Sequence, residues 1–231
     1  MLIDIHTHNL DDETSELEHY CHADLSTPLP CHLNFQKTKV CIGLHPWFLP
    51  SSLESGVALL NQWRDKLLSL NIDNWIFGEC GLDRVKGPDL SFQLEFLKIQ
   101  IEWAQDHNKP FIILHCVKAF QEMDKVIKDH HFKGSFIFHD FRGNWIITQQ
   151  LLKNPKVYFS LGGLLFVREH SQKQIELIKN IPIERIFFET DDSKREIKEL
   201  YERFANLRDM EFNDLVIQIK RNYQQLINVE N

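Results

Sequence analysis

Short apolar runs alternate with longer amphipathic segments along most of the chain, and this alternation constrains the possible folds more than any other feature. Each run is rich in Ile, Val, Phe or Leu and is bounded by polar or turn residues. This pattern is typical of strands buried on both faces of a parallel sheet. We therefore predict seven strands, at Leu2–His6, Lys39–Gly43, Trp75–Glu79, Phe111–His115, Ser135–His139, Val157–Leu161 and Arg185–Glu189.

The segments between these runs have the spacing of helices. In Leu90–Asp106 apolar residues recur every three or four positions, and either Asp89 or Ser91 can cap the start. Repeated strand–helix units indicate a parallel sheet with crossover helices, closed as a barrel or open and doubly wound. With 231 residues, we expect one domain spanning 1–231. The other predicted helices are Gly56–Leu70, Ala119–Lys128, Asn144–Leu152, Gln172–Lys179, Glu196–Ala205 and Asn213–Asn228.

Polar residues at the strand ends decide between the barrel and the open sheet. His6, Glu79, His115 and His139 each end a predicted strand, and Asp191 lies just past the seventh. In a barrel, all strand carboxyl ends converge on one face, where active sites form. An open sheet would spread the same residues along a line. We therefore predict an α/β fold of the TIM-like (β/α) barrel type.

The region where a second strand would normally lie is unusual. Asp11–Gln36 contains Pro28 and Pro30 and has no convincing apolar run. We expect a loop there, with room for one short helix at Asp12–Tyr20. The predicted barrel is accordingly seven-stranded or distorted.

Composition limits the compartment and the partners. The chain has five cysteines, an odd number, and no leader resembling an export signal, so we expect reduced thiols in a cytoplasmic protein. The Cys-His pairs that begin at Cys21 and Cys31 do not have the close ligand spacing of structural zinc sites. No apolar run reaches the roughly 20 residues of a membrane span. A net charge of −7 disfavours tight, non-specific binding to duplex DNA, but allows cleavage of a small phosphoester or a nucleic-acid end.

Two histidines close the first predicted strand. Side chains two residues apart in extended backbone point to the same face, so His6 and His8 can present two imidazoles to one ion. Divalent transition metals favour such nitrogen ligands. A chance pair is the alternative in a chain with 12 histidines. The place of the pair at the end of a barrel strand favours metal binding.

Carboxylates follow two other strands. Glu79 can bridge two cations held about 3.5–4 Å apart. Asp191 can bind a cation and also take a proton from the attacking water. Glu189 should alternate to the other face and brace the barrel or a basic neighbour. Asp192 is an alternative N-cap for the helix that follows.

The remaining candidates are histidines and a second-layer acid. His115 and His139 occupy equivalent positions on consecutive strands, which favours a role as ligands over a structural role. His45, beyond another strand end, is expected to line the pocket. Asp83 either orients a histidine ligand or caps the loop that follows it. Cys116 next to His115 is not expected to act as a nucleophile, because adjacent strand residues point to opposite faces.

The complete set of four histidines and two acids suits two divalent cations that share a bridging carboxylate. A bound cation lowers the pKa of water towards neutrality. The sequence has no P-loop, dinucleotide-binding fingerprint or Gly-x-Ser-x-Gly elbow that would offer another catalytic mechanism.

Six motifs in this order resemble those of the TatD family of metal-dependent hydrolases, within the amidohydrolase-like barrels. The closing segment also matches, with Asn222 at the usual asparagine. The resemblance implies a phosphoesterase, with DNA-directed nuclease activity in some members, that uses two ions of zinc, magnesium or manganese. It also implies that Glu79 bridges and that Asp191 is both ligand and base. The motifs are Asp4–His8, Gly43–Trp47, Gly78–Asp83, Leu114–Cys116, Phe138–Gly143 and Phe188–Asp191, and the implied ligands are His6, His8, Glu79, His115, His139 and Asp191.

The chain departs from the family at positions that would hold a phosphate. Many members have an arginine where this chain has Val117, with Lys118 next to it. Arg142 replaces the usual small residue after the His-x-Phe motif and can compensate. The proline usual after the Thr-Asp pair is absent, and Asp192–Lys194 takes its place.

Three functions are therefore open. The first is a phosphoesterase or deoxyribonuclease that acts on DNA ends or nucleotides, without a membrane or an obligate protein partner. The second is a hydrolase of C–N or C–O bonds, because the same metal chemistry serves attack on carbonyl groups. The third is a non-catalytic metal-binding barrel, which the intact ligand set disfavours.

Overall fold

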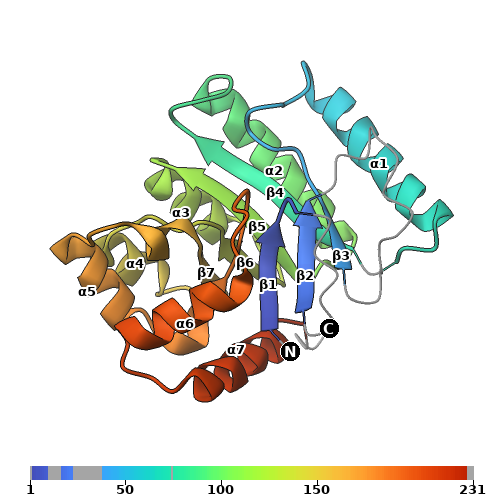
Figure 1. Cartoon of the computed structure of the whole chain (residues 1–231). Helices are drawn as coiled ribbons and strands as arrows, with labels where there is room; N and C mark the ends of the chain where they lie inside the picture. Colours follow the sequence, from blue (N-terminus) through green and yellow to red (C-terminus); the bar gives the residue numbers. More distant parts are fainter. Residues whose placement is uncertain (1, 10–16, 23–37, 74, 228–231) are drawn as a thin grey trace.

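Eight parallel strands form one curved sheet in the order β1 to β8 (Figure 1). The structure is a computed structural model that describes residues 2–9, 17–22, 38–73 and 75–227. Each strand pairs in parallel with the next along the chain, as expected when helices connect the strands. The strands are β1 Leu2–Thr7, β2 Leu17–His22, β3 Thr38–Ile42, β4 Ile76–Asp83, β5 Phe111–Val117, β6 Ser135–Phe138, β7 Val157–Leu161 and β8 Ile186–Phe188.

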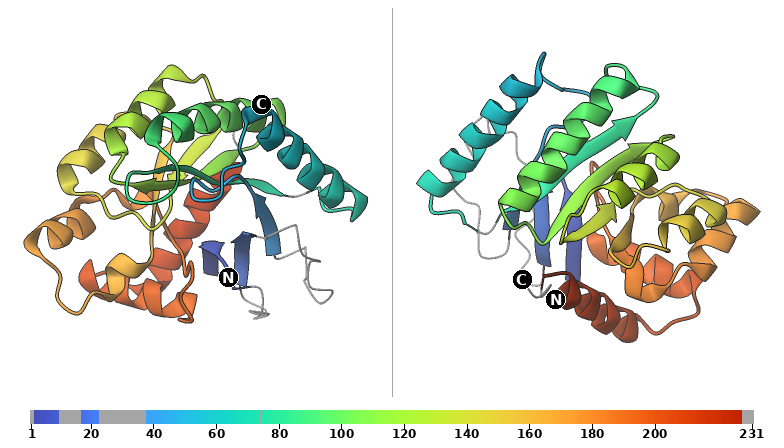
Figure 2. Two further views of the ribbon diagram at one scale, coloured as in Figure 1. Left: turned by 90° about the horizontal axis from the view of Figure 1, so that it is seen from above. Right: turned by 180° about the vertical axis from the view of Figure 1, so that it is seen from behind.

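The helices lie around the outside of this sheet (Figure 2). Their bounds follow the predicted ones closely, and α2 coincides with its prediction. Of the two expected caps for α2, Asp89 is the one used: its side chain accepts a hydrogen bond of 3.0 Å from the Phe92 amide. The helices are α1 Leu53–Ser69, α2 Leu90–Asp106, α3 Phe120–Asp129, α4 Trp145–Leu151, α5 Gln172–Asn180, α6 Ile197–Leu207 and α7 Phe212–Ile227, with short 3-10 turns at η1 Gly163–Phe166 and η2 Ile183–Arg185.

The expectation of a loop in place of the second strand was wrong. Leu17 pairs with Leu2 of β1, and His19 pairs with Thr38 of β3, so β2 completes an eight-stranded sheet. The helix expected at Asp12–Tyr20 is excluded where it overlaps β2, and its first five residues lie outside the described residues. The segment is a strand without an apolar run because ladders on both sides support its extended backbone, a tertiary effect that overrides local propensity.

The ring of strands closes at a narrow seam between its first and last members. Among the described residues, one isolated bridge joins Thr7 to Asp191. The amide of His8 donates to the Asp191 carbonyl at 3.0 Å, and the Asp191 amide donates to the His6 carbonyl at 3.1 Å. The α/β barrel class is thus confirmed, and the barrel is distorted at this seam.

Buried aromatic side chains fill the space between the sheet and its helices. Phe77, Phe111, Phe136 and Phe159 are fully buried, as expected for strands covered on both faces. No helix in the described part of the chain is both long and apolar enough to span a bilayer.

Polar contacts attach the last two helices to the first and last strands. The Tyr201 hydroxyl donates to the Ile3 carbonyl at 3.0 Å and accepts from the Ile3 amide at 3.1 Å, which joins α6 to β1. Asn222 of α7 donates to the carbonyls of Ile183 and Ile186, at 2.7 and 3.0 Å. These contacts fix the seam from its outer side.

Candidate metal centre

Six predicted side chains meet at the carboxyl ends of the strands. His6 lies near the end of β1 and His8 just beyond it, Glu79 and His115 lie in β4 and β5, and the other two follow β6 and β8. Parallel strands present their carboxyl ends to one face, so residues far apart in the sequence come together here. The six are His6, His8, Glu79, His115, His139 and Asp191.

Glu79 lies at the centre of this group, and its Oε1 atom faces one set of ligands. Oε1 is 3.0 Å from His6 Nε2 and 3.2 Å from His8 Nε2. The Oδ1 atom of Asp191 is 3.7 Å from His6 Nε2 and 3.5 Å from His8 Nε2. Two imidazole nitrogens and two carboxylate oxygens can therefore surround one cation.

The other oxygen of Glu79 faces a second set. Oε2 is 2.7 Å from His139 Nε2 and 3.6 Å from His115 Nδ1. The Nε2 atom of His45 is 3.7 Å away on the same side. One carboxylate whose two oxygens face separate groups of histidines has the geometry of a bridge between two metal ions.

The donor set fits divalent cations on two further grounds. The His6 ring is fully buried, and neither of its nitrogens has a hydrogen-bond partner of acceptable geometry among the described residues. A buried polar atom without a partner is costly, and a cation at Nε2 would satisfy it. Imidazole nitrogens with carboxylate oxygens suit zinc and manganese, and carboxylates also suit magnesium.

Charges in the centre are strongly coupled. Burial alone would raise the pKa of Glu79, but His139 and His6 outweigh it and hold that pKa well below its usual range. Burial alone would lower the pKa of His139, but Glu79 and Glu189 outweigh it and raise that pKa well above its usual value. A cation at His139 Nε2 would replace the proton that this environment otherwise holds.

Asp83 both contacts a histidine of the centre and caps the loop that follows it. Its Oδ2 atom is 3.3 Å from His115 Nε2 and accepts a hydrogen bond of 2.6 Å from Trp47 Nε1. Its Oδ1 atom accepts from the amides of Val85 and Lys86, at 2.7 and 3.0 Å. Burial raises the pKa of Asp83, but these bonds outweigh it and lower that pKa overall. The carboxylate thus occupies one nitrogen of His115 and leaves Nδ1 towards Glu79.

Glu189 contacts a basic neighbour, as expected, but it turns towards the centre to do so. It is fully buried, accepts a hydrogen bond from the Asp140 amide, and places Oε1 3.6 Å from His139 Nδ1. The expected direction was wrong because β8 ends at Phe188, so the pleat of the strand no longer sets the direction of Glu189. An acid directly after a short strand is the signal that could have shown its role.

Two other expectations concern residues beside the centre. Asp192 does not cap the next helix, since α6 begins after Glu196. Burial raises the pKa of the Cys116 thiol to about 12, which agrees with the expectation that it is not a nucleophile.

A cavity of about 250 Å³ opens over the centre. Its lining includes His45, together with Trp47, Phe48 and Asp192. A neighbouring cavity of about 390 Å³ shares His8, Asp191 and Asp192 with it and adds Lys194.

The two predicted phosphate contacts lie outside both cavity linings. Lys118 follows β5 and is exposed. Arg142 makes an ion pair with Asp140, with Nε and Nη2 each 2.7 Å from Oδ2. Sequence reasoning missed Trp47, Phe48 and Lys194 as lining residues, although Trp47 follows the predicted His45 by two residues.

The sequence profile described as TatD related DNase matches residues 29–228. The chain belongs to the TatD family. The matched region includes Glu79, His115, His139 and Asp191 but begins after His6 and His8, which the structure places beside Glu79.

Curated relatives agree with this family. A protein of Vairimorpha ceranae, provisionally named a deoxyribonuclease TATDN1 homologue, is 25% identical over 162 residues, 69% of this chain. The match spans 54% of that relative, so the aligned part is about half its length. YabD of Bacillus subtilis, named an uncharacterized metal-dependent hydrolase, is 27% identical over 81% of this chain and 76% of its own.

Solved structures of the family share the fold. YJJV, a TatD homologue from Escherichia coli, superimposes with a TM-score of 0.77 over 98% of this chain and 97% of its own, at 18% identity. A TatD family hydrolase from Entamoeba histolytica gives 0.70 over 97% of both chains, at 17% identity.

Proposed function

We propose that this TatD-family protein is a divalent-metal-dependent phosphoesterase that cleaves DNA ends or nucleotides. The observation that carries the proposal is the central carboxylate, because each oxygen of Glu79 faces a different pair of histidines. The names of the relatives, which include deoxyribonuclease and metal-dependent hydrolase, support the same reaction class.

In this proposal two ions of zinc, magnesium or manganese are held by the six clustered side chains. The ions supply Lewis acidity and lower the pKa of the attacking water. Asp191, whose side chain is 29% exposed, meets both the histidine cluster and the cavity, so its carboxylate would be the group that accepts a proton there. Asp83 keeps His115 Nδ1 directed at Glu79. The ligands are His6, His8, Glu79, His115, His139 and Asp191.

The location and partners belong to the proposal as well. Cys80 and Cys116 are free thiols in the described part of the chain, which fits a reducing, cytoplasmic setting. Lys194, in the neighbouring cavity, provides a cation for a substrate phosphate. We propose action as a single domain without an obligate protein partner.

A hydrolase of C–N or C–O bonds is the second candidate. Among the described residues, neither Lys nor Arg lines the cavity directly over the centre. The predicted clamp residue Arg142 is already paired with Asp140. A carbonyl substrate would not need the missing cation.

A substrate panel with added Mn²⁺ or Zn²⁺ separates these functions. We expect turnover of p-nitrophenyl phosphates and no turnover of p-nitrophenyl acyl esters. The opposite selectivity would support the second candidate. If the protein turned over neither substrate class while elemental analysis showed bound metal, the result would support a non-catalytic metal-binding barrel.

Two substitutions test the assigned residues. Glu79→Ala and Asp191→Ala should each reduce kcat by at least about 10³-fold while the circular dichroism spectrum stays that of the native fold, because both remove a ligand of the centre. Glu95→Gln, on the exposed face of α2, is the matched control and should leave kcat unchanged. Full activity in either test variant would refute the assignment.

A further inference from the structure

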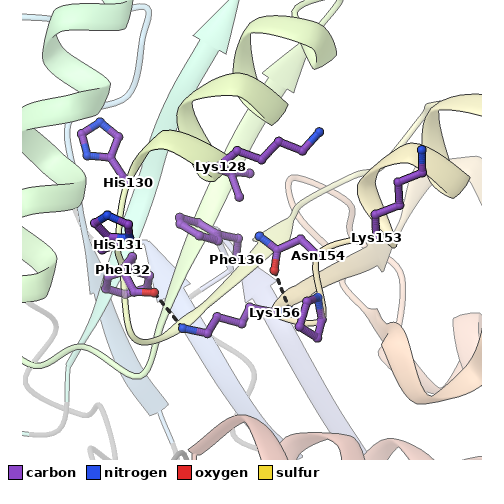
Figure 3. A pocket seen from close by; sticks show the side chains of 10 residues that line it. Lys128, His130, His131, Phe132, Phe136, Lys153, Asn154 and Lys156 are labelled. Atoms are coloured by element: carbon purple, nitrogen blue, oxygen red, sulfur yellow. Dashed lines mark hydrogen bonds between the residues drawn. The ribbon is translucent and has the colours of Figure 1, made fainter.

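Figure 3 shows the side chains that line a cavity of about 490 Å³. The cavity lies at the opposite end of the sheet from the candidate metal centre. It is formed by the turn after α3 and the turn before β7, next to the amino-terminal ends of β6 and β7. Strand carboxyl ends form the metal centre, so the two cavities cannot share a ligand. Its polar lining consists of Lys128, His130, His131, Lys153, Asn154 and Lys156.

The charge of this cavity is opposite to that of the whole chain. The net charge is −7, yet the described residues of the lining include three lysines, two histidines and no acid. Lys128 is neutralised by Asp124, whose Oδ2 lies 2.5 Å from Nζ. Lys153 and Lys156 form no ion pair with a carboxylate among the described residues. A concave surface with uncompensated cations concentrates anions.

Two donors in the cavity are held in place by the backbone. The Nζ atom of Lys156 donates to the Phe132 carbonyl at 2.9 Å, which leaves two of its three N–H groups free to bind a ligand. The Oδ1 atom of Asn154 accepts from the Lys156 amide at 2.9 Å, so its NH₂ group is oriented as a donor. Asn154 and Phe136 both line the cavity (Figure 3). Donors that are already fixed lose little entropy on binding.

We propose that this cavity is a binding site for the phosphate or pyrophosphate group of a small phosphorylated molecule. Lys156, Lys153 and the Asn154 amide supply charge-assisted and neutral hydrogen bonds to phosphate oxygens. A small ligand is favoured over a nucleic-acid strand because the cations surround a cavity and do not follow an extended groove. The site does not depend on the metal centre or on the reaction proposed for it.

Calorimetric titration with pyrophosphate tests the proposal. The full chain is first stripped of metal with a chelator and dialysed, so that pyrophosphate cannot be held by bound cations. We expect saturable binding with a Kd below about 1 mM that weakens as salt is raised. Lys153→Gln should weaken binding, and Lys153→Gln combined with Lys156→Gln should weaken it at least about tenfold.

Two matched controls exclude general electrostatics and the metal centre. Lys133→Gln removes a charge from an exposed residue close by in the sequence that does not line the cavity. Lys194→Gln removes a cation beside the metal centre. Both should leave Kd unchanged. Absence of saturable binding, an equal loss in either control, or binding of a single-stranded oligonucleotide without binding of pyrophosphate would each overturn the proposal.

Discussion

At the scale of single residues, the centre depends on which nitrogen each histidine turns towards Glu79. His6, His8 and His139 present Nε2, whereas His115 presents Nδ1. The difference has a visible cause, because Asp83 occupies Nε2 of His115. A neutral imidazole has one donor and one acceptor nitrogen, so a carboxylate at Nε2 fixes the proton there and frees Nδ1 to bind a cation.

Asp83→Asn should therefore weaken the centre without removing a ligand. We expect metal affinity or kcat/KM to fall about 10–100-fold, because the amide no longer fixes the tautomer of His115. Metal content after dialysis against a competing chelator, together with kcat/KM, is the measurement. Asp106→Asn, an exposed change on α2, should alter neither. If Asp83→Asn kept the metal content and kcat/KM of the wild type, the role of Asp83 would be limited to capping the loop that follows it.

Lys109 gives the fold a pH dependence that is separate from the centre. Burial lowers the pKa of Lys109 to about 7 from its usual 10.5. Its Nζ atom lies 3.0 Å from the centre of the Trp75 ring and donates to the Trp75 carbonyl at 3.1 Å. Between these two pKa values the unfolded chain binds more protons than the folded one, so stability rises with pH.

Urea unfolding at pH 7 and pH 9 tests this coupling. Relative to Lys109→Met, the free energy of unfolding of the wild type should rise by about 2 kcal/mol between these pH values. Lys98→Met on α2 is the control, and its difference from the wild type should not change with pH. If the free energy of unfolding changed equally with pH in the wild type and in Lys109→Met, Lys109 would keep its usual pKa in the fold.

At the scale of elements, α2 fixes the backbone next to His45 and at Asp83. Gln93 accepts a hydrogen bond of 2.7 Å from the Asp83 amide and donates one of 2.9 Å to the Asp83 carbonyl. Gln100 accepts a hydrogen bond of 2.7 Å from the Leu44 amide and donates one of 3.2 Å to the Leu44 carbonyl. Residues seven apart lie on the same face of a helix, so one face of α2 satisfies the backbone just after β3 and at the end of β4.

Gln93→Met should destabilise the protein because it leaves two buried backbone groups of Asp83 without partners. The expected loss is about 2–4 kcal/mol in the free energy of unfolding, measured with urea. Glu95→Met, on the exposed face of the same helix, should change it by less than about 0.5 kcal/mol. If the two substitutions lowered the free energy of unfolding equally, water would be replacing the hydrogen bonds that Gln93 makes to Asp83.

These elements also show what the sequence could predict. Apolar periodicity located α2, β5 and β6, because both faces of those two strands are buried. It missed β2, whose strand geometry comes from its neighbours. It also missed the direction of Glu189 and the pairing of Arg142 with Asp140, because both depend on loops that follow strand ends.

At the scale of the whole molecule, the ligands of the centre lie on both sides of the seam. His6 lies in β1 and His8 directly follows it, and Asp191 follows β8, where a single bridge closes the ring among the described residues. Inside the seam, the Thr190 amide and hydroxyl donate to the Asp4 carboxylate at 3.1 and 2.6 Å. Cations held by residues from both sides would add a further link where the ladder is weakest.

Metal loading should accordingly stabilise the entire barrel. Binding to the folded state alone contributes about 4 kcal/mol when the free ion is a thousandfold above Kd. We expect a higher Tm with Zn²⁺ or Mn²⁺ than after chelation, and slower hydrogen exchange at the amides of Ile5 and Phe187 on the two seam strands. Glu79→Gln should lose most of this gain, because each of its oxygens faces one half of the centre. A Tm that rises equally in Glu79→Gln would locate the stabilising ion elsewhere in the chain. Slower exchange confined to β4 and β5 would instead mean that metal binding does not join β1 to β8.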